Sequence, residues 1–65
     1  MRYFIVFFDG LYDEGHFRGH QAMMSYGFLN RNITEESIME EFGYDIVIIT
    51  NLIEVSEQDY VEFLS

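Results

Sequence analysis

Residues 3–8 read Tyr-Phe-Ile-Val-Phe-Phe, an unbroken run of aromatic and β-branched side chains. Such residues favour β-strands, and successive side chains of a strand point to opposite faces of its sheet. A strand that is apolar on both faces needs cover from both sides, so we expect residues 3–8 to form the central strand. Asp9-Gly10 closes the run, and the stretch 9–15 predicts a turn or loop.

A return strand is expected after this loop, over about residues 17–29. Gly19 and Gly27 lie inside this segment, and the polar side chains of His20 and Gln21 interrupt its apolar pattern. This composition is typical of an edge strand or of a strand that contains a bulge.

The signals for a first helix begin near residue 33. Thr34 is a suitable N-cap, and the carboxylates that follow it suit the positive end of the helix dipole. Ile33 is expected to pack on Ile38 across the first turn, and Gly43 is expected to end the helix as a left-handed residue. The buried side of this helix is then expected to consist of Ile38, Met39 and Phe42.

Residues 44–53 are expected to form a third strand, which is again apolar on both faces. Ser56 is a suitable N-cap for a second helix, with Asp59 at its third position. The sequence therefore predicts one α+β domain over residues 1–65, in the order β-β-α-β-α. A hairpin followed by a helical crossover places the third strand beside the first, in the sheet order 2-1-3. We expect the two short helices to lie on one face of this three-stranded sheet.

Two helices on one face would leave the other apolar face of the sheet uncovered. Such a face exceeds the apolar area that soluble monomers normally expose. Side chains alternate between the two faces, so the uncovered face holds one of two sets of strand residues. One set is Phe4, Val6, Phe8, Val47 and Ile49, and the other is the opposite set. We therefore expect a homodimer, or another protein partner, on that face.

The composition excludes several other classes of protein. The chain has no cysteine, which excludes disulfides and thiolate metal sites. Its formal net charge of −9 opposes direct contact with nucleic acids, whose phosphates are bound mainly by Lys and Arg, and with anionic membranes. The apolar run 3–8 is too short for a signal peptide, and no run approaches the roughly 20 apolar residues of a membrane-spanning helix. We expect a soluble cytoplasmic protein that binds neither nucleic acid nor membrane.

The negative charge is concentrated in the second half of the chain. Residues 32–65 carry nine carboxylates and no basic side chain, whereas residues 1–31 balance three carboxylates with three arginines. One interpretation is that this charge only keeps an apolar chain soluble. The other is a surface that presents carboxylates to a basic protein, such as a nucleic-acid-binding protein that accepts them in place of phosphates. The candidate contact residues are the carboxylates of the two helices: Glu35, Glu36, Glu40, Glu41, Glu57, Asp59 and Glu62.

No catalytic motif is present. The serines, threonines and glycines match neither a nucleophile elbow nor a phosphate loop nor a dinucleotide fingerprint, so we expect no enzyme and no cofactor. His16 and His20, with Asp13 and Glu14 nearby, are the one cluster of metal-ligand type. Gly15 and Gly19 disfavour a helix, on which the two histidines would meet, and on a strand two residues four apart are separated by about 13 Å. We therefore expect a loop with solvated polar side chains and no metal site. A small-ligand or metal-binding module around these histidines is one alternative function.

Residues 48–63 read Ile-Ile-Thr-Asn-Leu-Ile-Glu-Val-Ser-Glu-Gln-Asp-Tyr-Val-Glu-Phe. A short apolar strand thus runs through Thr50-Asn51 into a helix that starts with Ser-Glu-x-Asp-Tyr. This segment resembles the C-terminal end of small uncharacterised proteins of bacterial phages and mobile elements, and the opening Met-Arg-Tyr-Phe-Ile-Val resembles theirs more loosely. The resemblance implies an accessory protein in the host cytoplasm that binds a host protein, such as a nucleic-acid-handling factor that it inhibits. The main alternative is a structural or regulatory subunit that forms homo-oligomers through its apolar sheet face.

Overall fold

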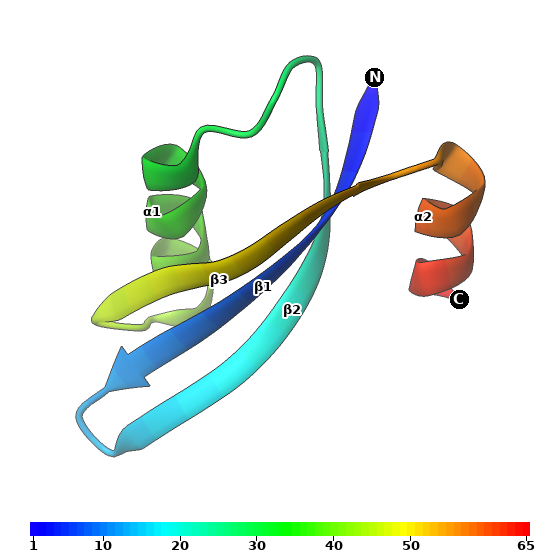
Figure 1. The fold of residues 1–65 in the computed structure, drawn as a ribbon. Helices are drawn as coiled ribbons and strands as arrows, with labels where there is room; N and C mark the ends of the chain where they lie inside the picture. The colour runs from blue at the N-terminus through cyan, green and yellow to red at the C-terminus, as the bar shows by residue number, and fades with distance from the viewer.

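The apolar run near the start of the chain forms the middle of the sheet, as its two apolar faces predict. In the computed structural model, which describes residues 1–65, β1 (Arg2–Tyr12) pairs with β2 (Gly15–Ser25) on one side. It pairs with β3 (Ile46–Val55) on the other side, and both pairings are antiparallel. With α1 (Arg31–Phe42) and α2 (Glu57–Leu64), the order is β-β-α-β-α and the sheet order is β2-β1-β3 (Figure 1). The predicted α+β class and sheet order are confirmed.

The first hairpin is longer and more regular than predicted. Residues 9–15 do not form a loop, because β1 continues to Tyr12 and only residues 13–14 separate it from β2. Two contacts explain why a polar residue and a glycine are tolerated in the strand. Asp9 lies opposite Arg18 and accepts a hydrogen bond from its Nε at 3.1 Å. Gly10 leaves room for the Tyr44 ring, which a Cβ at that position would approach to 2.7 Å.

β2 lies at an edge of the sheet, which is one of the two alternatives that its composition indicated, and the bulge lies instead between β1 and β3. The β1–β2 register runs without interruption from Tyr12↔Gly15 to Arg2↔Ser25, and β2 ends four residues before the predicted boundary. The β1–β3 register shifts between Phe7 and Phe8. Such a shift bends a strand and increases its twist, and β3 is visibly curved in Figure 1.

The alternation of β1 separates two faces of the sheet. Phe4, Val6 and Phe8 are buried on the face covered by α1, which we call the α1 face. The largest core cluster lies there and consists of Val6, Phe8, Ile38, Val47 and Ile49. The alternate residues of β1, such as Tyr3 and Phe7, point to the opposite face, which we call the α2 face.

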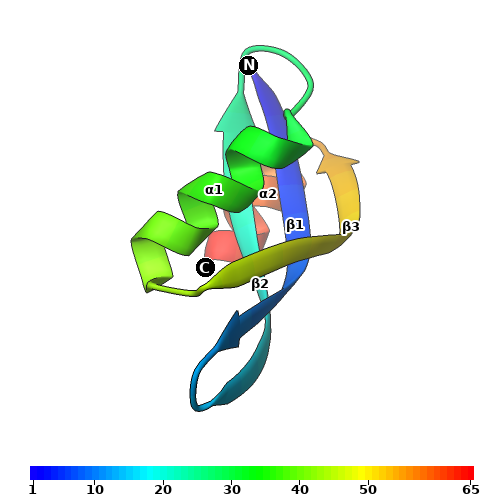
Figure 2. The same ribbon diagram turned by 90° about the vertical axis from the view of Figure 1, so that its left-hand side faces the viewer.

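The prediction that both helices share one face is wrong, because α2 packs on the α2 face. The rings of Tyr3 and Tyr60 lie 5.0 Å apart, and the rings of His20 and Phe63 lie 5.3 Å apart. In Figure 2, α1 lies in front of the sheet and α2 behind it. Since α1 already fills the face above the core cluster, the aromatic side chains of α2 gain burial only on the other side of the sheet.

The first helix begins one turn earlier than predicted. Asn30, not Thr34, is the N-cap, and its Oδ1 accepts a hydrogen bond from the Ile33 backbone N–H at 3.0 Å. Thr34 is buried within the helix, and Ile33 is 66% exposed and forms no staple on Ile38. The two other helix-end predictions are confirmed. Gly43 ends α1 with φ 75°, and the Ser56 side chain caps α2 by accepting from the Asp59 N–H.

Candidate functional site

Large apolar side chains remain exposed on the α2 face because α2 covers only one end of it. The exposed fractions are 39% for Leu11, 51% for Ile46, 48% for Ile48 and 42% for Ile53. We call these four residues the apolar patch. Leu11 lies directly opposite Ile46 across the β1–β3 pairing, and all the other patch residues belong to β3. Of the two alternate sets that the sequence left open, Phe4, Val6, Phe8, Val47 and Ile49 are therefore covered and the opposite set carries the open surface.

The polar groups beside the apolar patch neutralise one another. Asp9 lies opposite Ile48 in the register, and its Oδ1 is 3.1 Å from Arg18 Nε and 3.4 Å from His16 Nε2. Asp9 is the only carboxylate among the β1 and β2 residues. The one charge within the patch region of the sheet is therefore neutralised, whereas the unpaired carboxylates of Asp13, Glu14 and Asp45 lie at the end of the patch next to Leu11 and Ile46.

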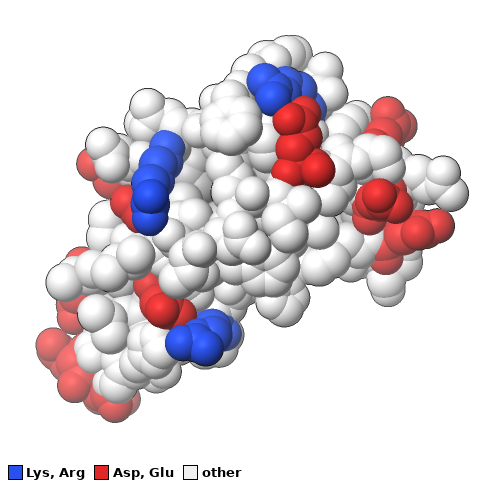
Figure 3. Space-filling model, in the orientation of Figure 1, with Lys and Arg blue, Asp and Glu red and all other residues white.

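Each of the three arginines of the chain is paired with a carboxylate of the same chain. The pairs are Arg2–Glu54, Arg18–Asp9 and Arg31–Glu35. Figure 3 shows each blue side chain beside a red one, with further carboxylates grouped at separate ends of the molecule. The basic side chains thus serve internal contacts, and the net charge of −9 is carried by carboxylates that face no cation of this chain.

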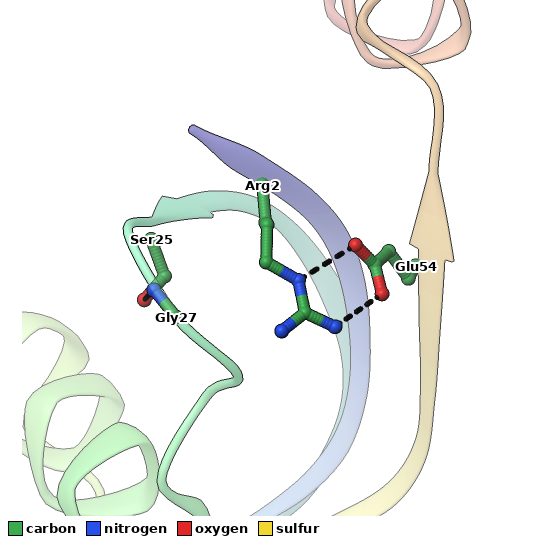
Figure 4. Close-up of polar contacts among 4 residues, drawn as sticks. All are labelled: Arg2, Ser25, Gly27 and Glu54. Carbon is green, nitrogen blue, oxygen red and sulfur yellow. Dashed lines mark hydrogen bonds and ion pairs between the residues drawn. The ribbon is translucent and has the colours of Figure 1, made fainter.

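The Arg2–Glu54 pair joins the start of β1 to the end of β3. Arg2 donates from Nε and from one terminal nitrogen to the two carboxylate oxygens of Glu54, at 2.8 and 2.7 Å (Figure 4). Its guanidinium carbon also lies 5.6 Å from the Phe4 ring centre and 5.3 Å from that of Phe28. The hydrogen bond from Arg2 lowers the pKa of Glu54 from its ordinary value of 4.5, partly opposed by desolvation. The same bond raises the pKa of Arg2.

Acid is expected to weaken this junction. Because the pKa of Glu54 is lower in the folded chain than in the unfolded chain, its contribution to stability is complete above about pH 4.5. That contribution is lost as the pH falls through the lowered pKa. The melting temperature of the wild type should therefore fall more steeply below pH 4.5 than that of Glu54→Gln, which has no carboxylate to protonate there. Thermal denaturation followed by circular dichroism measures both curves, and parallel curves would contradict the prediction.

Tyr3 links β1 to the start of α2. Its hydroxyl donates to Glu57 Oε2 at 3.1 Å, and its ring packs on Tyr60. Desolvation, with the Glu57 carboxylate as a second cause, raises the pKa of Tyr3 above its ordinary value of 10.0. Glu57 therefore has a structural contact that positions α2.

The structure does not bring the seven predicted contact carboxylates together. Those of α1 and those of α2 belong to helices on opposite faces of the sheet. Four of the seven accept hydrogen bonds from this chain: Glu35 from Ile49 N, Glu41 from Gln21, Glu57 from Tyr3 and Glu62 from Gln58. The side chains of the other three, Glu36, Glu40 and Asp59, are exposed and make no such contact. One continuous acidic surface over both helices is therefore not formed.

Glu35 and Arg31 instead cover the free edge of β3. Glu35 Oε2 accepts from the Ile49 backbone N–H at 2.9 Å, and Arg31 donates to the Ile49 carbonyl at 2.6 Å. The two side chains also pair with each other, one helical turn apart, at 3.5 Å. They occupy the N–H and C=O of Ile49, which a further strand would otherwise use at this edge. The i, i+4 spacing of Arg31 and Glu35 is visible in the sequence, but the prediction of Thr34 as the cap placed Arg31 outside the helix.

Glu35→Ala is expected to destabilise the protein by about 1–3 kcal/mol, because it leaves the Ile49 N–H without its partner. Glu36→Ala is the matched control, since Glu36 neighbours Glu35 in the helix but is exposed and should change stability by less than about 0.5 kcal/mol. Urea denaturation of the two variants measures the difference. Equal effects would mean that Glu35 has no structural role at the β3 edge.

The histidines lie on β2 and form no metal-binding group. The structure contains no cluster of three or more His, Cys, Asp or Glu residues that could hold a metal ion. His16 lies near Asp9, whereas His20 packs against the rings of Phe7 and Phe63. The expectation of a solvated loop at these residues is wrong, because β2 begins at Gly15 and contains both histidines, which serve different contacts.

Comparison with known protein families, curated proteins and solved structures finds no match to this chain. No helix in the structure has both the length and the apolar character required to cross a lipid bilayer.

Proposed function

We propose that this chain is a non-enzymatic protein-binding domain and that the apolar patch is its principal contact surface. The observation that carries the proposal is the exposure of Leu11, Ile46, Ile48 and Ile53 on a face that α2 leaves half open. Leu11, Ile46 and Ile48 are neighbours on one face of the sheet, and a group of exposed apolar side chains on a small domain favours a protein partner. Because the adjacent charges of Asp9 and Arg18 are paired, the partner that fits presents an apolar surface without strong charge.

A context for such a partner comes from the resemblance of residues 48–63 to small phage and mobile-element proteins. In that context the chain acts in the cytoplasm of a bacterial host, and its partner is a host protein that it binds and inhibits. A homo-oligomeric subunit, whose partner on the patch is a second copy, uses the same surface. The two versions differ in the identity of the bound protein and not in the residues that bind it.

A pair of matched lysine variants tests the patch. Ile48→Lys places a charge within it, and Ile33→Lys adds the same charge on the exposed side of α1, where the side chain is 66% exposed. Tagged wild type and both variants are incubated with bacterial lysate and washed at low and at high salt. We expect wild type and Ile33→Lys to retain a protein from the lysate at both salt concentrations. Ile48→Lys is expected to lose that protein. Apolar contacts persist at high ionic strength, whereas exposed charge contacts are screened.

Two results would contradict a heterologous partner on the patch. A protein retained equally by Ile48→Lys does not bind there. Recovery of the chain alone at both salts would instead favour the homo-oligomeric subunit.

A basic protein partner is a second candidate, and Glu36 and Glu40 favour it. Both are exposed on α1 and neither accepts a hydrogen bond from this chain. A partner of this kind should be retained only at low salt, since screening weakens contacts between exposed charges. It should also be lost by a Glu36→Gln, Glu40→Gln double variant and kept by Ile48→Lys.

A further inference from the structure

The two edges of the sheet are protected very differently. The β3 edge is interrupted by the bulge opposite Phe7 and Phe8, and Arg31 and Glu35 occupy the backbone of Ile49. A bulge and a covering helix are both devices that prevent an edge strand from pairing with another chain. The β3 edge is therefore blocked at Ile49 and interrupted by the bulge, so it offers no long regular edge to a further strand.

The β2 edge has no bulge, and no side chain bonds to its outer backbone groups. Helix α2 contacts β2 through the ring of Phe63 on His20, on the α2 face. The 11 residues of β2 pair with β1 in one uninterrupted register, and the strand contains no proline, lysine or carboxylate. Its one charged side chain, Arg18, is paired with Asp9 on the neighbouring strand. A long and regular edge without protection is a template for pairing with another strand.

The free backbone groups of this edge can be assigned from the turn. In a hairpin with a two-residue turn, the residues that flank the turn form a hydrogen-bonded pair, and such pairs then alternate along the ladder. Tyr12 and Gly15 flank the turn, so the odd-numbered residues of β2 bond to β1. By this alternation the backbone groups of Leu11 point away from β2. The structure agrees, because the Leu11 carbonyl accepts a hydrogen bond from Asp45 N, on the β3 side of β1, at 2.8 Å. The residues that point N–H and C=O groups outward are His16, Arg18, His20, Ala22 and Met24.

Charge decides which strand fits this edge. All twelve carboxylates lie outside residues 15–34, so β2 and the segment after it form the longest acid-free part of the chain. A second copy carries a net charge of −9 and is repelled by most of the surface of the first. At the β2 edge that repulsion is reduced, because β2 carries no carboxylate of its own and its one cation, Arg18, is paired with Asp9. The carboxylate of Glu41 contacts β2 only through the side chain of Gln21.

We propose that two copies of this chain pair through β2, antiparallel and about a two-fold axis, to form a continuous six-stranded sheet. The register that overlaps the full length of β2 places His20 opposite His20 of the second copy. It also places the acidic turn at Asp13 and Glu14 beside residues 26–27 of the second copy, which carry no acid. Pairing at this edge leaves the apolar patch free, so it is independent of the partner proposed for that surface.

Single cysteines test both the pairing and its register, because the chain has no cysteine of its own. In His20→Cys the two Cα atoms would be about 5.5 Å apart, within the range of about 4.4–6.8 Å that a disulfide spans. In Met24→Cys, on the same strand and the same face, the two new residues would be about 27 Å apart. Under mild oxidation, His20→Cys is expected to form covalent dimers and Met24→Cys is not. Equal cross-linking of the two variants, or none in either, would overturn the proposal.

A proline variant provides a second test that does not depend on His20. Ala22→Pro removes an N–H that points outward, whereas Gln21→Pro removes one that bonds to β1. Wild type is expected to have a light-scattering mass near twice 7.8 kDa, and Ala22→Pro a mass near 7.8 kDa with its circular dichroism spectrum retained. Gln21→Pro should lose structure, which confirms the assignment of the ladder. A wild-type mass near 7.8 kDa, or a dimeric Ala22→Pro, would overturn the proposal.

Discussion

Ile38→Ala is expected to remove most of the stability of this protein. Ile38 has no exposed surface, and it is the residue through which α1 enters the cluster of Val6, Phe8, Val47 and Ile49. Truncation of a buried isoleucine costs about 2–5 kcal/mol, because it loses burial and leaves a cavity. Small domains have total stabilities near the lower end of about 5–15 kcal/mol, so this loss is a large fraction of the whole.

Ile33→Ala is the matched control for Ile38→Ala. It makes the same chemical change in the same helix, but Ile33 is 66% exposed. Its effect should stay within about 0.5 kcal/mol. Thermal denaturation shows the contrast clearly, since each kcal/mol shifts the melting temperature of a domain of this size by about 4–8 °C. Similar melting temperatures for the two variants would mean that α1 does not pack on the sheet through Ile38.

Gly10→Ala is expected to destabilise the protein by about 1–3 kcal/mol through overpacking. A Cβ at this position would lie 2.7–2.9 Å from three ring atoms of Tyr44. That ring cannot move freely, because it packs against the rings of Phe8, Tyr12, Phe17 and Phe42 at centre distances of 5.9–6.2 Å. An alanine in a strand is otherwise favoured over glycine, so the sign of the effect identifies the steric contact.

Gly27→Ala separates this contact from the general effect of replacing a glycine. A Cβ at Gly27 meets no atom within 4 Å, and the residue is exposed in the segment between β2 and α1. Its stability should be unchanged or slightly increased, because alanine restricts the unfolded chain. Urea denaturation of both variants measures the difference. A Gly10→Ala variant as stable as Gly27→Ala would show that the Tyr44 ring does not lie over β1.

Local signals in the sequence predicted most of the fold because they depend on neighbouring residues. Gly43 and Ser56 act at helix ends through backbone geometry and short-range hydrogen bonds, and both were placed correctly. The error at the start of α1 arose because Asn30 and Thr34 are both suitable caps, and the sequence offers no local reason to prefer one. The structure shows the benefit of the earlier start, which brings Arg31 and Glu35 over β3.

The extent of the first hairpin was underestimated for a different reason. Asp9 and Gly10 are typical of turns, but each is compensated in the strand by a residue that is distant in the sequence. Arg18 pairs with Asp9 from the neighbouring strand, and Tyr44 fills the space above Gly10. Composition alone does not reveal such compensation.

The sequence by itself determined an α+β domain with β1 at the centre, the sheet order, the strong acidity and an excess of apolar surface over what two helices can cover. These properties follow from composition and from local periodicity. Only the tertiary structure decided that α2 lies opposite α1, which face holds the apolar patch, and which carboxylates are engaged. The physical reason is that β1 is apolar on both faces, so its pattern is nearly symmetric between them. Which helix covers which face depends on contacts between residues that are distant in the sequence, such as Ile38 with the core cluster and Tyr60 with Tyr3.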